Sequence, residues 1–246
     1  MQKNTVLIII IVGLLGFISG FLLANFLNRS EIADVRARND GAGTNVPAIP
    51  GASVEASLSP EEIKAKVAEA DQNPQNFAFQ KDLGLSLYRY GAMTQNVDLL
   101  EQSKRLLERA STLNTSDFDT LVGLGHAEFD IGYFKKDALR FEKAREVYQK
   151  ALKLRPNDAD IQTDLGISYF VQEPPAYDRA EAELKKVASI DPKHERSLQF
   201  LVQVHARQKR IPEAKAALER LKGLNPANTA IPELNSQIAK AESGVS

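Results

Sequence analysis

Apolar residues recur along this chain in two patterns, a continuous run near the N-terminus and a helical period over most of the remainder. Residues 6–27 are almost wholly apolar, and residues 4–28 carry no charge. From residue 59 onward, apolar residues return every three or four positions, which places them on one face of a helix. The pattern therefore predicts a membrane-spanning helix and, after an interruption, a helical domain.

The N-terminal run contains 22 residues, which at about 1.5 Å per residue cross the hydrocarbon core of a bilayer. A cleaved secretory signal peptide is the alternative, because it also begins with a short basic segment before an apolar one. The run is longer than the apolar region of most signal peptides, and it lacks the small residue expected three positions before a cleavage point. We therefore expect residues 1–28 to be an uncleaved, single-pass signal-anchor.

Small residues share one face of this predicted membrane helix, at Gly13, Gly16 and Gly20. Gly16 and Gly20 form a GxxxG match, which lets two helices approach closely and predicts a homodimer through the membrane segment. The alternative is that glycine is simply frequent in membrane helices.

Basic residues flank the predicted membrane helix on both sides. Lys3 precedes it, whereas Arg29, Arg36 and Arg38 follow it, and a count of these residues alone would leave the following domain in the cytoplasm. The layout is nevertheless that of a bacterial signal-anchor, and long domains cross the membrane largely regardless of nearby charge. We therefore expect a protein of the inner cell membrane whose domain lies on the periplasmic, extracytoplasmic side.

Residues 29–58 interrupt the helical pattern with Gly, Pro, Ala and Ser. They contain too few large apolar residues to offset the entropy lost on ordering, so we expect a flexible linker with a mean reach of about 30 Å. The helical pattern resumes with Ser59, Pro60 and two glutamates, a typical helix start, because Ser caps a first turn and acids suit its positive end. Residues 59–76 are expected to hold one pre-repeat helix that ends before Asn73-Pro74.

A Leu-Gly pair recurs at Leu83-Gly84, Leu124-Gly125 and Leu165-Gly166, with successive pairs 41 residues apart. A fixed period of this size predicts a stack of helical hairpins, because one hairpin cannot bury its apolar face alone. Four repeats fit the pattern, over residues 77–117, 118–158, 159–194 and 195–228, and residues 229–246 are expected to form a capping helix and tail.

The repeats differ in length in a way that predicts their shape. The first two have seven more residues than the fourth between the Gly position and the following Ala position, which is about two helical turns. We therefore expect longer helices in the first two repeats. The third repeat has two extra residues in its Pro-rich segment 173–178, which is either a second partner contact or a tolerated insertion.

The stretch Tyr148-Gln-Lys-Ala151-Leu-Lys-Leu-Arg-Pro156-Asn157, with a Leu-Gly pair upstream, resembles the tetratricopeptide repeat (TPR). The resemblance implies an all-α fold, an α-solenoid in which helical hairpins form a right-handed superhelix and first helices line a concave groove. It also implies that this groove binds other proteins or peptides. The groove positions carried over from the family are Lys81, Leu85, Tyr88 and Arg89, then Val122, His126, Phe129 and Asp130, then Thr163, Ile167, Phe170 and Val171, and finally Gln199, Gln203 and Arg207.

Three aromatic residues, Tyr88, Phe129 and Phe170, lie one repeat apart and are expected to form a row. Such a row can hold an extended or helical peptide, because aromatic side chains bury a large area at a small entropic cost. The alternative is that these rings pack against neighbouring helices.

Composition and motifs exclude several kinds of function. Lys and Arg number 31 against 32 Asp and Glu, so no excess of basic residues favours nucleic acid. The chain has no cysteine, which excludes disulfides, thiolate metal sites and cysteine nucleophiles. It also has no phosphate-binding glycine loop, no His-Glu-x-x-His and no Gly-x-Ser-x-Gly. We expect neither an enzyme nor a bound metal or cofactor.

The three histidines provide little further evidence of chemistry. His126 and Asp130, four residues apart, are expected to share one helix face, where a solvated or groove-lining histidine is favoured over a metal ligand. His194 and His205 have no evident companions in the sequence.

These observations favour a membrane-tethered adaptor or scaffold that binds protein partners at the cell envelope, for example during assembly of an envelope complex. A narrower alternative is an assembly factor similar to the TPR proteins of c-type cytochrome maturation, because the short helix before Asn73-Pro74 is similar to theirs. A further alternative is a non-catalytic regulatory subunit of a membrane enzyme complex.

Overall fold

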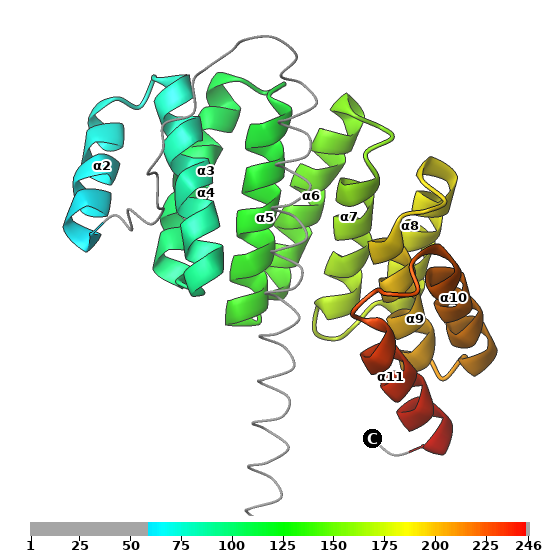
Figure 1. Ribbon diagram of the computed structural model, residues 1–246. Coiled ribbons are helices and arrows are strands. Elements are labelled where there is room, and N and C mark those ends of the chain that lie inside the picture. The colour runs from blue at the N-terminus through cyan, green and yellow to red at the C-terminus, as the bar shows by residue number, and fades with distance from the viewer. Residues whose placement is uncertain (1–58, 245–246) are drawn as a thin grey trace, which may run out of the picture.

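The computed structural model describes residues 59–244, which form a stack of α-helices without strands (Figure 1). Within that range no helix is both long and apolar enough to cross a bilayer. The predicted signal-anchor (residues 1–28) and linker (residues 29–58) lie outside the described residues. The described helices are α2 (Pro60–Gln72), α3 (Phe77–Thr94), α4 (Val97–Leu113), α5 (Phe118–Lys135), α6 (Ala138–Leu154), α7 (Ala159–Val171), α8 (Tyr177–Ile190), α9 (Glu195–Arg207), α10 (Ile211–Leu224) and α11 (Ile231–Ser243).

The helices begin where the sequence supplies a capping side chain. The hydroxyl of Ser59 accepts a hydrogen bond from the backbone N–H of Glu62, and the Glu62 carboxylate accepts one from the backbone N–H of Ser59. This reciprocal capping box confirms the predicted start of α2. The first helices of the four pairs also begin at matching positions of the repeat, with N-caps at Asn76, Asp117, Asp158 and His194.

Helix lengths follow the spacing of the repeats. α3 and α5 have 18 residues and α4 and α6 have 17, whereas α9 has 13 and α10 has 14. The prediction of longer helices in the first two repeats is therefore confirmed. In the third repeat α7 and α8 are as short as α9 and α10, so the two extra residues lie in the loop that contains Pro174 and Pro175.

The two helices of each of the first three pairs approach closely at the glycine of the Leu-Gly motif. A Cβ placed on Gly84 would lie 2.8 Å from Leu107, and one on Gly166 would lie 2.8 Å from Leu184. At Gly125 the nearest atom is in the ring of Tyr148, at 2.5 Å. Because real Cβ atoms do not come this close to their neighbours, only glycine permits the observed helix spacing.

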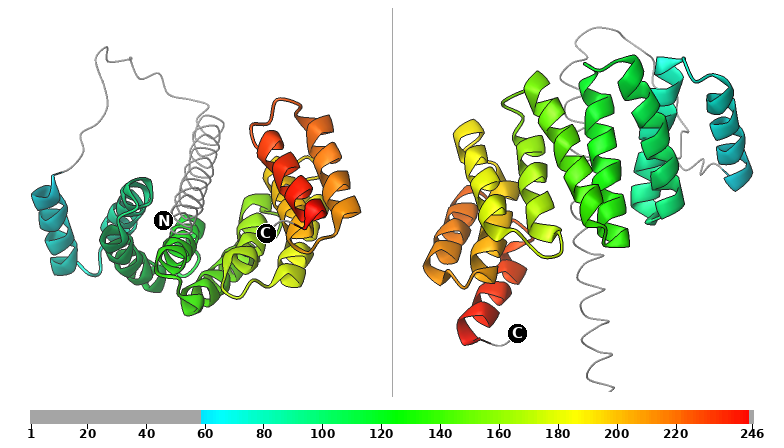
Figure 2. Two further views of the ribbon diagram at one scale, coloured as in Figure 1. Left: turned by 90° about the horizontal axis from the view of Figure 1, so that it is seen from below. Right: turned by 180° about the vertical axis from the view of Figure 1, so that it is seen from behind.

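The stack curves toward its first helices. α3, α5, α7 and α9 contact one another in sequence, whereas each second helix packs between its own first helix and the first helix of the next pair. Seen along the helices, the pairs follow an arc with α2 at one end and the pair α9–α10 at the other (Figure 2). The surface of α3, α5, α7 and α9 on the concave side of this arc is called the inner face below. The handedness of the predicted superhelix stays a prediction.

Both ends of the stack are covered by a single helix. At the N-terminal end Ile63 and Val67 of α2 pack on Leu83 and Leu87 of α3, and α2 is fastened by side chains at its C-terminal end. The buried amide of Gln80 donates to the backbone carbonyls of residues 70 and 73, at 2.7 and 3.0 Å, and Asp71 pairs with Arg105 and Arg109. At the other end Leu234 and Ile238 of α11 join the large core that runs from α4 to α11.

One ionisable side chain, His205 of α9, is buried in this core with 5% of its surface exposed. Its Nδ1 has no hydrogen-bond partner, and burial lowers the pKa of the ring below its ordinary value. Glu181 opposes that shift, whereas Arg210 and Lys185 reinforce it.

We expect the Gly125→Ala variant to unfold at a lower urea concentration than the natural protein, because the added methyl must displace the ring of Tyr148. Its free energy of unfolding should fall by about 1–3 kcal/mol. The measurement is urea denaturation followed by far-ultraviolet circular dichroism. Gly223 supplies the matched control, since a Cβ there meets no atom within 4 Å. Gly223→Ala should raise stability by about 0.5–1 kcal/mol through its better helix propensity. Equal losses in both variants would contradict the packing argument.

The pKa of His205 predicts a loss of stability under mild acid. Below about pH 6.5 the unfolded chain binds a proton that the buried ring does not yet bind, so the free energy of unfolding falls as the pH falls. We expect His205→Gln to reduce this dependence between about pH 7 and pH 5. Urea midpoints measured across that range for both proteins provide the comparison. Parallel pH profiles would show that another group is responsible.

Candidate partner-binding face

Polar side chains join the first two inner helices, α3 and α5. The ammonium of Lys81 donates to the carboxylate of Asp117 at 2.9 Å and lies 3.4 Å from that of Asp119. Further along, the hydroxyl of Tyr88 donates to Asp130 at 3.0 Å. These bonds connect consecutive repeats across the inner face and so help to set the spacing between them.

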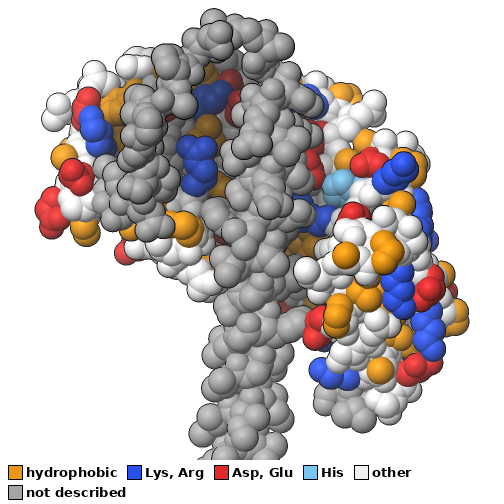
Figure 3. All heavy atoms as spheres, in the orientation of Figure 1, with side chains coloured by type: hydrophobic (Ala, Val, Ile, Leu, Met, Phe, Trp, Pro, Cys, Tyr) orange, Lys and Arg blue, Asp and Glu red, His pale blue; other side chains and the backbone are white. Residues whose placement is uncertain are grey.

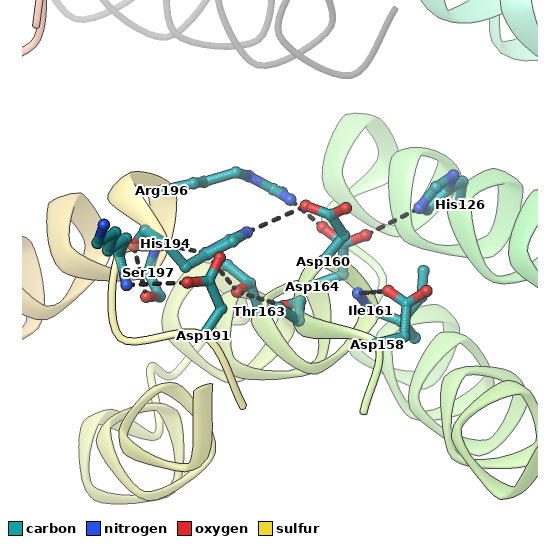
Figure 4. A network of polar contacts seen from close by, with 12 residues as sticks. His126, Asp158, Asp160, Ile161, Thr163, Asp164, Asp191, His194, Arg196 and Ser197 are labelled. Carbon is teal, nitrogen blue, oxygen red and sulfur yellow. Dashed lines mark hydrogen bonds and ion pairs between the residues drawn. The ribbon is translucent and has the colours of Figure 1, made fainter. Parts of the chain in front are cut away.

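The carboxylate of Asp164 joins three inner helices at one point (Figure 4). One of its oxygens lies 2.9 Å from Nε2 of His126 on α5, and the other accepts from Nη2 of Arg196 on α9 at 2.5 Å. The side chain of Asp164 is only 2% exposed. Removing one partner of a buried charge leaves the other without full compensation, so this contact strongly constrains how α5, α7 and α9 are placed.

His194 links α9 to α7 and also starts α9. Its Nδ1 accepts the backbone N–H of Ser197 at 3.2 Å, as the N-cap of the helix. A nitrogen that accepts a hydrogen bond carries no proton, so we assign the ring proton to Nε2, which then donates to Asp160 at 3.1 Å. This hydrogen bond holds the pKa of Asp160 below its ordinary value.

Two members of the predicted aromatic row, Tyr88 and Phe129, are buried, and the third, Phe170, is half-buried. The ring of Tyr88 lies 5.7 Å from that of His126, beside the polar contacts just described. Phe129 is 3% exposed and packs edge-on against Phe141 at 5.4 Å. For Phe129 the packing alternative therefore holds. Phe170 is half-buried and lies 5.8 Å from Phe200.

The groove positions carried over from the TPR family differ widely in their exposure. The exposed positions are Arg89 and Arg207. The buried ones are Tyr88, Phe129, Asp130, Thr163 and Ile167. The half-buried ones are Lys81, Leu85, Val122, His126, Phe170, Val171, Gln199 and Gln203. Several of these side chains contact the next inner helix, and their role in binding a partner stays a prediction. Where described side chains are visible in Figure 3, positive and negative ones lie close together.

One expectation about the histidines needs correction. His126 and Asp130 both lie on α5, where His126 contacts Asp164 and Asp130 accepts a hydrogen bond from Tyr88. His194 has companions, since it caps α9 and contacts Asp160. The repeat register contained a signal for His194, because it stands where Asn76, Asp117 and Asp158 cap the earlier first helices. No comparable signal pointed to Asp164 with Arg196, which come from different repeats.

Metal-binding clusters and cavities bear on what the inner face within residues 59–244 could bind. No group of three or more His, Asp or Glu residues there is placed to hold a metal ion. A cavity of about 580 Å³ lies elsewhere, between α2 and the pair α3–α4, where Ile63, Val67 and Leu99 contribute to its lining.

Comparisons with known proteins agree with the geometry of the stack. A family model described as a TPR repeat matches residues 140–172, and one described as a tetratricopeptide repeat matches residues 176–238. Proteins with such repeats are typically non-catalytic scaffolds. No curated protein sequence is significantly similar to this chain.

Solved structures share the same arrangement of helices. The protein in a crystal structure of MamA shares 21% sequence identity with this chain, and the match covers 73% of this chain and 90% of the MamA chain with a TM-score of 0.52. A thermophilic TPR protein from Thermus thermophilus is 17% identical over 74% of this chain and 89% of its own, with a TM-score of 0.52. The C-terminal part of a TPR repeat-containing protein from Cytophaga hutchinsonii is 19% identical over 70% of this chain and 65% of its own, with a TM-score of 0.53. The described part of this chain is therefore an all-α solenoid with the fold of TPR proteins, and its residues 140–172 and 176–238 match models of the tetratricopeptide repeat.

Proposed function

We propose that this protein is a membrane-tethered adaptor whose inner face binds a segment of a protein partner at the cell envelope. The observation that carries the proposal is the continuous inner face of α3, α5, α7 and α9, which successive repeats extend along one side of the solenoid. TPR proteins bind peptides or proteins, and a concave surface built from repeats offers them an extended contact.

The tether is the second part of the proposal, and its support comes from the sequence alone. The apolar residues 6–27 are long enough to span the inner membrane, and residues 29–58 would give the solenoid reach from it. With the solenoid on the periplasmic side, the anchor would concentrate the inner face near envelope proteins. Reversible binding would then bring partners together at the membrane.

Two half-buried inner positions test the use of this face, Val122 on α5 and Gln203 on α9. We expect the double variant Val122→Arg, Gln203→Arg to capture fewer partners, because each new side chain projects into the proposed contact. The measurement is quantitative proximity labelling in cells from a labelling enzyme fused to the C-terminus. A loss of about tenfold or more for specific partners is expected, as for disruption of a central contact.

A matched double variant, Ala182→Arg with Ala216→Arg, places the same side chains at exposed positions of the second helices α8 and α10. It should label the same partners as the natural protein. Circular dichroism would establish that both variants remain folded. If a folded inner-face variant keeps every partner, the inner face is not the binding surface.

A further inference from the structure

Several carboxylates lie on the inner face where α5 and α7 are neighbours. The helix α7 (Ala159–Val171) contains Asp160 and Asp164 but no Lys or Arg. Three more carboxylates face the same side from the start and the middle of α5. Lys81 from α3 pairs with Asp117, and Arg196 from α9 pairs with Asp164. The five carboxylates are Asp117, Asp119, Asp130, Asp160 and Asp164.

Two of these carboxylates are within reach of a ligand. The side chain of Asp119 is 62% exposed and that of Asp160 is 25% exposed. The side chain of Asp164 is only 2% exposed, because it is enclosed between His126 and Arg196. A cation that approached the inner face would therefore meet Asp119 on α5 and Asp160 on α7. Charge at a partly buried face is screened less by salt than charge on an open surface.

Arg196 is a second observation of a different kind. Its side chain is only 5% exposed, and it reaches from α9 across to Asp164 (Figure 4). A guanidinium offers five N–H donors, yet Nε of Arg196 is buried without any hydrogen-bond partner. Because buried donors are rarely left unpaired, this atom indicates an acceptor oxygen that a ligand would supply.

The two observations together restrict the chemistry of the ligand. A metal ion or a polyamine would satisfy the carboxylates but offers no acceptor to Arg196. An acidic peptide would satisfy Arg196 but would be repelled by the exposed carboxylates of Asp119 and Asp160. A peptide that contains Lys or Arg meets both requirements, because its side chains are cationic and its backbone carbonyls accept hydrogen bonds.

We propose that the inner face from α5 to α9 binds a basic peptide segment of the protein partner. Its Lys or Arg side chains would pair with Asp119 and Asp160, and a backbone carbonyl would accept from Arg196. This inference rests on the proposed function and adds the chemical class of the partner to it.

Fluorescence anisotropy of the full chain in detergent micelles tests the inference with two labelled twelve-residue peptides, one of repeated Arg-Gly-Ser and one of repeated Glu-Gly-Ser. We expect the basic peptide to bind about tenfold or more tightly than the acidic one, with an affinity that falls as salt is raised. The double variant D119N/D160N should lose about tenfold of that affinity. The control D98N/E146Q removes two exposed carboxylates from the second helices α4 and α6 and should bind as the natural protein does.

Arg196→Lys tests the carbonyl contact, because lysine keeps the charge beside Asp164 but lacks an Nε–H of the same geometry. A folded variant should bind the basic peptide more weakly, with circular dichroism as the check on folding. If this variant does not fold, the comparison of D119N/D160N with D98N/E146Q still decides the question.

Preference for the acidic peptide, or equal losses in the two double variants, would overturn the inference. Either result would leave the adaptor function standing if Val122→Arg, Gln203→Arg still lost its partners in cells. If the protein shows no preference for the basic peptide and the variant Val122→Arg, Gln203→Arg still labels every partner, both the basic-peptide inference and the adaptor proposal are overturned.

Discussion

The whole stack depends on how closely the two helices of a repeat can approach. At Gly84, Gly125 and Gly166 the facing side chain occupies the space in which any other residue would place its Cβ. In each pair, a Leu or Tyr side chain of the second helix therefore packs directly against the backbone of the first helix. Because the same contact recurs in three successive repeats, the pairs have similar geometry, and buried residues from α4 to α11 join in one large core.

Packing within a pair does not by itself determine how neighbouring pairs are oriented. That orientation is constrained by polar contacts across the inner face, from Lys81 and Tyr88 at one side to Asp164 and His194 further along. Polar contacts require specific distances and angles, whereas apolar contacts tolerate sliding. The inner face thus combines two roles, since side chains that could meet a partner also hold the curvature of the surface.

The sequence allowed the repeats to be predicted well, because their evidence is local and recurrent. The Leu-Gly pairs, the capping residues at Ser59 and the extra length of the first two repeats all lie within one repeat or one helix. The burial of Phe129 could not be predicted in the same way. Its burial depends on Phe141 of α6, whose ring packs edge-on against it. The contact of Asp164 with Arg196 also escaped prediction, since it depends on how α7 and α9 are juxtaposed in space.

The separate packing of α2 has a consequence for local opening. This helix buries Ile63, Val67 and Ala70 in a small cluster with α3 and α4, apart from the large core that extends to α11. Regions with few buried apolar contacts open more often than the rest of a native protein. Backbone amides of α2 should accordingly exchange with deuterium before those of α5 to α8. The N-terminal boundary of the solenoid is then a thermally fraying edge, whereas its middle repeats form the slowest-exchanging unit.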